Sequence, residues 1–194
     1  MSLSRRSRLA AETGDRRALK SREAVIGAFN RLVLEHGYDG INAQDIADAA
    51  NVGRSTFYKH FGSKRDVFRD SLPPRLAPLA DLPFTEQLHP AVVSTLEHFW
   101  ENRRIGRFIL SGEFADEMTS VLGEMIAERL HHRGASTLIV AREAIAMYAA
   151  HGMMGVIHDW LEARKHHESA QLARILHTMS RAAILSACHD QHSS

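Results

Sequence analysis

Apolar residues recur along most of this chain at the three- and four-residue spacing of an α-helix, and no segment alternates convincingly as a strand. The first confident helix runs from about Arg17 to His36, with a periodic apolar face made of Ala24, Val25, Ala28, Phe29, Leu32 and Val33. His36-Gly37 supplies its stop, because glycine readily takes the left-handed conformation that often ends a helix. The pattern predicts an all-α protein.

Three shorter helices are expected next. Asn42 can cap a helix over residues 43–50, with Asp45 three residues on as in a capping box. A third helix spans about residues 54–60 and ends at Phe61-Gly62. Ser63 and Asp66 form another capping-box start, for a helix that Pro73-Pro74 should stop because proline does not fit a helix interior.

The five prolines of the chain all lie between residues 73 and 90, at 73, 74, 78, 83 and 90, which predicts a linker or irregular connector. Beyond it the pattern predicts helices over Pro90 to Glu101, Arg104 to Leu110, Asp116 to His132, Ser136 to Arg164 and Ser169 to Cys188, the last two capped by Ser136 and Ser169. We therefore expect a basic flexible tail (1–16), a small helical domain (17–73) and a larger helical domain (74–194).

Composition narrows the class of protein. Of 194 residues, 44% are hydrophobic and 24% charged, as in a soluble globular protein with a real core. No apolar run spans a bilayer and no signal peptide is recognisable, so we expect a cytoplasmic protein with no membrane contact. Cys188 is the only cysteine, which excludes an internal disulfide and a four-cysteine zinc site.

Charge is divided unevenly along the chain. Residues 1–75 carry 14 Lys and Arg against 9 Asp and Glu, a net +5, whereas residues 76–194 carry 10 against 14, a net −4. A basic N-terminal third is where a polyanion would bind, and chance clustering of solvated charge is the alternative.

The segment "IADAANVGRSTFYKHF" (residues 46–61) places two helices on either side of a three-residue link, as in a helix-turn-helix. Ile46 and Ala50 should face the core, Val52 should fill the turn, and Phe57 should anchor the second helix. The remaining side chains of that helix face outward and offer the donors and positive charge that read a major groove: Arg54, Ser55, Thr56, Tyr58, Lys59 and His60.

The longer stretch "INAQDIADAANVGRSTFYKHFGSKRDVF" resembles the DNA-binding domain of the TetR family of bacterial transcription regulators, and with the preceding helix the resemblance covers about residues 17–72. It implies a TetR-like fold of about nine helices, in which a three-helix DNA-binding domain precedes a helical effector-binding and dimerisation domain.

The resemblance also implies roles for individual residues. Arg54 and Thr56 would face bases, Gln44 would reach a base or a phosphate, and the phosphate contacts would come from Asn42, Tyr58, His60 and Lys64. Ser55 would touch DNA or point at solvent, Tyr58 is otherwise a packing residue, and Arg54 and Lys59 are otherwise solvated charges. The basic tail would either enter the minor groove or follow the DNA backbone, or it would stay disordered. Its basic residues are Arg5, Arg6, Arg8, Arg16 and Arg17.

Three positions depart from the family pattern. Asn51 replaces the turn glycine, and asparagine is the residue that best tolerates a left-handed backbone after glycine. Gly53 replaces a Ser or Thr cap, and Ser55 replaces a common glycine. We expect the turn to survive, with Asn51 left-handed, and operator preference to depend on residues 54–56.

The larger domain is expected to bind a partner copy and a ligand. Its last two helices carry more apolar surface than one thin domain buries, which predicts a homodimer joined as a four-helix bundle and a palindromic DNA site. An effector cavity would be lined by apolar, aromatic and Met side chains that are otherwise ordinary core, namely Phe99, Trp100, Phe108, Phe114, Met118, Leu122, Met125, Met147, His151 and Met154.

We expect no cofactor and no metal, because the histidines have no ligand spacing that completes a site. No catalytic motif is present either. The leading hypothesis is a dimeric repressor released from operator DNA by a small hydrophobic or aromatic effector. The alternative is an architectural or partner-binding protein whose helix-turn-helix no longer reads sequence.

Overall fold

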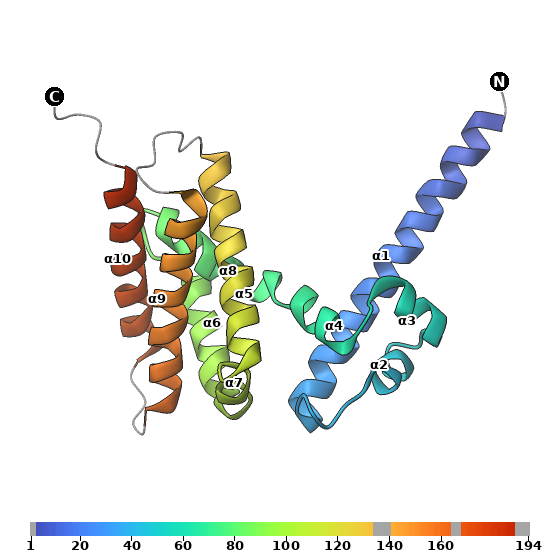
Figure 1. Cartoon of the computed structure of the whole chain (residues 1–194). Helices are drawn as coiled ribbons and strands as arrows, with labels where there is room; N and C mark the ends of the chain where they lie inside the picture. Colours follow the sequence, from blue (N-terminus) through green and yellow to red (C-terminus); the bar gives the residue numbers. More distant parts are fainter. Residues whose placement is uncertain (1–2, 134–140, 164–167, 189–194) are drawn as a thin grey trace. The chain divides into compact units, whose positions relative to one another are not determined.

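The computed structural model describes residues 3–133, 141–163 and 168–188, and these residues form ten α-helices and one 3-10 turn with no strand (Figure 1). The predicted all-α fold is confirmed. The chain divides into two compact units, Met1–Ser71 and Leu72–Ser194, which we call unit 1 and unit 2. None of the described helices has the length and apolarity to cross a membrane.

Unit 1 contains the helices α1 (Leu3–His36), α2 (Ala43–Ala49), α3 (Arg54–His60) and α4 (Lys64–Ser71). The bounds of α3 agree with the sequence prediction, but α1 begins at Leu3 and not near Arg17, within the segment expected to be a flexible tail. That segment is rich in Ala, Leu and Arg, which favour helix, and contains no proline. Its many charges obscured this propensity.

Aromatic and branched side chains from all four helices form the core of unit 1. Val25 and Phe29 come from α1, Ile46 from α2, Phe57 from α3 and Phe68 from α4, each with at most 3% of its surface exposed. The ring of Phe29 meets that of Phe68 edge-on, with centroids 6.4 Å apart. Because α2 and α3 have only seven residues each, this burial holds them in place more than their own backbone bonds do.

The link between α2 and α3 is a Schellman turn. Asn51 has φ +53°, as expected, and is the non-glycine residue with positive φ among those described. The amide of Asn51 donates to the carbonyl of Asp48 (3.0 Å), and the amide of Val52 donates to that of Ala47 (3.0 Å). These two bonds satisfy carbonyls at the end of α2 and set the direction in which α3 leaves.

Unit 2 contains α5 (Pro73–Asp81), the 3-10 turn η1 (Leu82–Phe84), α6 (Pro90–Glu101), α7 (Arg103–Ile109), α8 (Glu113–His132), α9 (Arg142–Glu162) and α10 (Ser169–Cys188). The ranges predicted for α6 and α10 are confirmed. Ser169 is the first residue of α10 and not its cap, and α9 begins at Arg142, while the predicted start Ser136 lies outside the described residues.

Helix α5 corrects the prediction that residues 73–90 form an irregular connector. Pro73 and Pro74 do end α4, but they also occupy the first two positions of α5, where a helix needs no amide N–H. Leu76 and Leu79 then bury completely. Proline disfavours a helix interior but suits the first turn of a helix, so a cluster of prolines fits a helix start as well as a connector.

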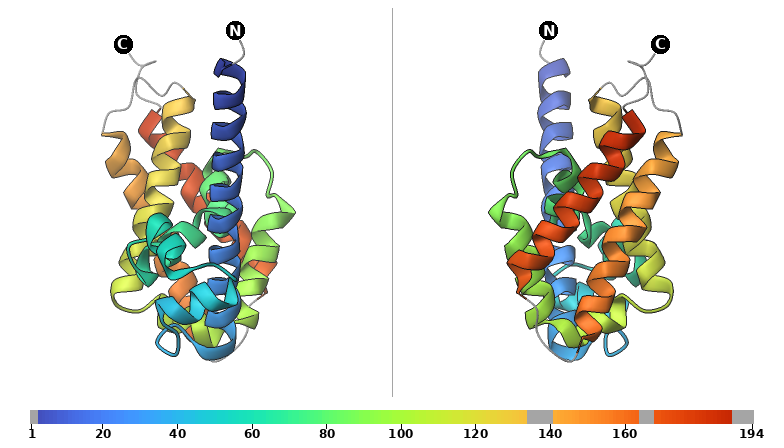
Figure 2. Two further views of the ribbon diagram at one scale, coloured as in Figure 1. Left: turned by 90° about the vertical axis from the view of Figure 1, so that its right-hand side faces the viewer. Right: turned by 90° about the vertical axis from the view of Figure 1, so that its left-hand side faces the viewer.

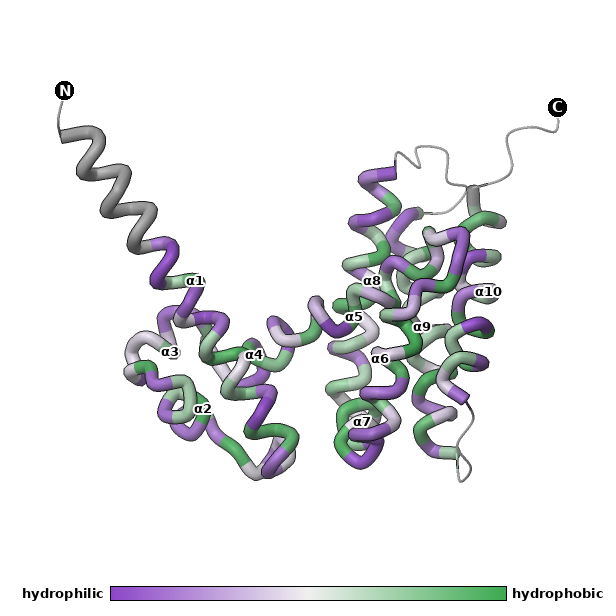
Figure 3. The backbone as a smooth tube through the Cα atoms, turned by 180° about the vertical axis from the view of Figure 1, so that it is seen from behind, coloured by the Kyte–Doolittle hydropathy of each residue, from purple (hydrophilic) through white to green (hydrophobic). Residues whose placement is uncertain are grey.

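Helices α8 and α9 pack side by side, with α10 along the other side of α9 (Figures 1 and 2). A Cβ atom at Gly123 of α8 would overlap the Met147 sulfur of α9, so the missing side chain leaves room for the methionine. Hydrophobic and hydrophilic residues interleave along these helices (Figure 3), and the buried ones include Leu122, Ile126 and Ile157.

The left-handed backbone at Asn51 predicts an asymmetric response to substitution. Asn51→Val should lower the free energy of unfolding by about 1–2 kcal/mol, because a branched Cβ clashes at positive φ, while Asn51→Gly should change it by less than about 0.5 kcal/mol. Urea unfolding followed by circular dichroism measures both. Ala49→Val, at an exposed helical position, is the control and should cost only the difference in helix propensity, roughly 0.5 kcal/mol. Equal losses for the two valine variants would contradict this account.

Candidate nucleic-acid interface

Helix α3 presents one polar face and is held by its other side. Phe57, only 1% exposed, and Phe61, only 2% exposed, anchor the helix and the residue after it. The side chains predicted to read DNA are gathered on the remaining surface: Arg54, Ser55, Tyr58 and Lys59 are exposed, and Thr56 and His60 are half-buried. Their contacts with DNA remain a prediction.

Two of these side chains also interact with each other. The Arg54 guanidinium lies 5.6 Å from the centroid of the Tyr58 ring, one helical turn away. Tyr58 meets Phe57 edge-on at 5.3 Å, yet 47% of its surface is exposed. Tyr58 therefore packs on its neighbours without giving up its access to solvent. Gly53 caps the helix without a side-chain hydrogen bond, as its identity requires.

The start of α2 is a complete capping box, as predicted. Asn42 Oδ1 accepts hydrogen bonds from the amides of Gln44 (2.8 Å) and Asp45 (3.2 Å), and the Asp45 carboxylate accepts from the amide of Asn42 (2.7 Å). Gln44 donates in turn to Asp48 (2.8 Å). Asn42 and Gln44 are both exposed, but the oxygen of Asn42 is already used within the helix.

Lys64 is arranged differently from the other predicted phosphate contacts. Its ammonium donates to the carbonyls of Tyr38 (2.8 Å) and Ile41 (2.7 Å) and lies 4.0 Å from the centroid of the Tyr38 ring. Burial lowers the pKa of Lys64, while Asp39 and Asp45 favour its charged form. Burial also raises the pKa of the Tyr38 hydroxyl.

Sequence reasoning missed one group that orients the helices of this interface. Arg22 of α1 forms an ion pair with Asp70 of α4 at 2.6 Å and lies 5.7 Å from the Phe61 ring centroid. Arg31 of α1 donates to the carbonyl of Ala49 at the end of α2 (3.4 Å). Spacing within one helix could not reveal these partners, because they are 48 and 18 residues away.

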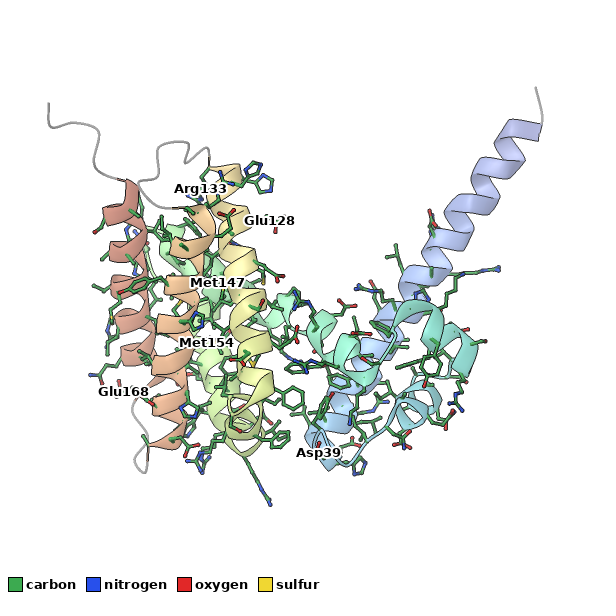
Figure 4. All side chains as sticks on the ribbon, in the orientation of Figure 1. Asp39, Glu128, Arg133, Met147, Met154 and Glu168 are labelled. Carbon is green, nitrogen blue, oxygen red and sulfur yellow. The ribbon has the colours of Figure 1, made fainter. Side chains whose placement is uncertain are left out.

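The residues predicted to line an effector cavity have varied environments in unit 2. Met118, Leu122 and Met154 are buried; Phe99, Trp100, Phe114, Met125 and Met147 are half-buried; Phe108 and His151 are exposed (Figure 4 labels Met147 and Met154). The ring of Trp100 packs at a tilt of 44° against that of Trp160, with centroids 5.0 Å apart, and Trp100 lines a surface groove of about 440 Å³. Their contact with a ligand stays a prediction.

The outer sides of α9 and α10 expose large apolar side chains. Tyr148 is 72% exposed, Met179 60%, and Ile175 and Leu185 42% each. A shallow hollow of about 70 Å³ between the two helices is lined by Tyr148, Gly152 and Met179 among others. We call this surface the α9–α10 face. Within the described ranges, no three His, Cys, Asp or Glu side chains are arranged to hold a metal ion.

Two family models match the chain on either side of the unit boundary. Residues 26–70, which include α2 to α3 and most of α4, match the model described as bacterial regulatory proteins of the tetR family. Residues 86–182 match the model described as the C-terminal region of a transcriptional regulator.

A curated relative matches about a quarter of the chain. The chain is 40% identical over 53 residues to the probable acrEF/envCD operon repressor of Escherichia coli strain K12, which covers 27% of this chain and 24% of that protein. Such matches span between 18% and 31% of the length of the first curated relatives.

Solved structures share the fold over nearly their whole length. The TetR transcriptional regulator from Streptococcus agalactiae 2603V aligns with TM-score 0.52 and 24% identity, over 88% of this chain and 98% of that one. FadR of Thermus thermophilus, a TetR-family repressor solved with lauroyl-CoA, aligns with TM-score 0.53 and 19% identity, over 89% and 98%.

Proposed function

Because this chain belongs to the TetR family of bacterial transcriptional regulators, we propose that it is a repressor that a small effector releases from operator DNA. The observation that carries the proposal is the polar face of α3, which is held rigidly by two buried aromatic side chains within the segment that matches the family. The curated relatives of the chain include a protein named as a probable operon repressor.

We assign the reading of bases to the first turn of α3. An α-helix fits the major groove, where a guanidinium can donate to guanine and a threonine methyl can contact thymine. Arg54 and Thr56 supply these groups, and Ser55 between them is the family departure that would alter operator preference. Tyr58, Lys59 and His60 then face phosphates, with Asn42 and Gln44 contributing from the start of α2.

Regulators of this family form dimers, and we propose that this one dimerises through the α9–α10 face. Contiguous exposed apolar side chains are uncommon on the surface of a monomer. Two helices from each copy would form a four-helix bundle and remove Tyr148, Ile175 and Met179 from water. A two-fold dimer places two α3 helices to read the halves of a palindromic site.

We propose an effector that is small and hydrophobic or aromatic and binds within unit 2. The solved relative FadR binds lauroyl-CoA, a ligand with a long apolar chain. Methionines of α8 and α9, including Met118, Met147 and Met154, supply adaptable side chains for such a guest. The effector must bind the form with low DNA affinity more tightly, because equal affinity for both forms shifts nothing.

Base reading and phosphate binding predict different responses to substitution on α3. Thr56→Ala should weaken binding to the preferred operator by about 1–3 kcal/mol per subunit and relax the choice of base, whereas Lys59→Met should weaken all duplexes alike and lower the salt slope by about 0.9 per subunit, or about 1.8 for a dimer. Fluorescence anisotropy with the chain's own upstream DNA at several salt concentrations measures both effects. An architectural protein would bind every duplex equally and show little loss with Thr56→Ala.

The proposed interface predicts that a charge on the α9–α10 face separates the copies. Met179→Glu should give a monomer in analytical ultracentrifugation, because the dimer would bury an unpaired carboxylate. Leu19→Glu introduces the same charge at an equally exposed position of α1, where Met179 and Leu19 each have 60% of their surface accessible. That control should remain dimeric. A dimeric Met179→Glu variant would exclude this interface.

The effector hypothesis predicts coupled changes in stability and DNA affinity. Among fatty acyl-CoA esters, free fatty acids and phenols, a true effector at 100 times its Kd should stabilise the protein by about 2.7 kcal/mol and raise its Tm. The same compound should dissociate the operator complex. A compound that raises Tm but leaves operator affinity unchanged is a bound ligand without a regulatory role, and failure of all three classes would contradict the proposed chemistry.

A further inference from the structure

The loop between α1 and α2 is held by a side chain that enters it from α4. Lys64 donates to two carbonyls of this loop, those of Tyr38 and Ile41, and its ammonium lies against the Tyr38 ring. We infer that Lys64 is a positioning residue for operator binding, which acts through the loop on the first turn of α2 and not through a phosphate contact. The inference rests on the proposed DNA-binding function.

The loop has little regular structure of its own to hold it. It begins at Gly37, whose φ of +76° ends α1, and a Cβ atom at Gly40 would overlap the carbonyl oxygen of His36. The backbone of the loop therefore requires glycine at both positions. Its side chains are fixed at Tyr38, whose ring meets Phe29 and Phe68 edge-on, and at Ile41, which is only 4% exposed. Lys64 supplies hydrogen bonds to the backbone between these points.

A short covalent and hydrogen-bonded path leads from Lys64 to the DNA-facing surface. Ile41 accepts the shorter of the two bonds, and the next residue is Asn42, the cap of α2. Asn42 fixes the amides of Gln44 and Asp45, and the far end of α2 passes through the Asn51 turn into α3. A shift of the Ile41 carbonyl therefore displaces the cap from which α2 starts.

The charges around Lys64 fit an internal role. Two of its three N–H donors are directed at carbonyls, and the negative charges of Asp39 and Asp45 favour the charged form of its ammonium. Figure 4 labels Asp39 in this loop. A lysine that gripped a phosphate would instead direct its donors to solvent, as exposed Lys59 on α3 is free to do in the presence of DNA.

The test compares Lys64→Met with Lys59→Met in the full-length protein. Lys64→Met should weaken operator binding roughly tenfold with the salt slope unchanged, since no phosphate contact is lost, whereas Lys59→Met should lower the slope by about 0.9 per subunit. Hydrogen exchange without DNA should be faster for the amides of Gln44 and Asp45 in Lys64→Met and unchanged for that of Phe61. If Lys64→Met does not fold, Lys64→Gln, which is uncharged but keeps donors, takes its place.

A double-mutant cycle tests whether Lys64 acts through the loop. Gly40→Ala disturbs the loop from the other side, so its effect on operator affinity should not add to that of Lys64→Met. Additive losses, or a reduced salt slope with normal exchange at α2, would overturn the inference and restore a phosphate role for Lys64. Absence of sequence-selective binding by the unmodified protein would instead overturn the proposed function. The exchange measurement, which needs no DNA, would still show whether Lys64 holds the start of α2.

Discussion

The burial of Phe57 and Phe61 is the interaction on which the exposed polar surface of α3 depends. A seven-residue helix has no independent stability in water, because its few backbone bonds do not offset the entropy of nucleation. Each fully buried phenylalanine contributes about 1.5–3 kcal/mol relative to an exposed one. These two rings therefore hold α3 in place and leave its polar side chains, from Arg54 to His60, on the surface proposed to face DNA.

The sequence predicted those features of unit 1 that depend on neighbouring residues. The limits of α3, the capping box at Asn42 and the left-handed Asn51 each follow from local chemistry, and the structure has them. The position of Lys64 was beyond sequence reasoning because its partners are backbone carbonyls 23 and 26 residues away, and a carbonyl carries no sequence signal. Helix α5 was missed for another reason, since Pro73 both ends one helix and starts the next.

In unit 2 the periodic pattern of apolar residues predicts the helices but not the role of each apolar side chain. Along α9, Met154 is buried and Tyr148 is 72% exposed, although both belong to the same apolar pattern. Periodicity identifies the helix but cannot distinguish a core position from an exposed position proposed to contact a partner copy. Both positions are apolar because burial of apolar surface away from water is favourable. Only the packing of α8 against one side of α9 separates the two classes. The same limit applies to the residues proposed to contact an effector.

The contact between Gly123 and Met147 determines how the space between α8 and α9 can change. The methionine side chain occupies the space beside Gly123, so a flexible thioether lies between α8 and α9 at this point. An unbranched side chain can change rotamer while the helices stay in place. A change of rotamer at Met147 would therefore alter the space between α8 and α9 without moving the backbone of either helix.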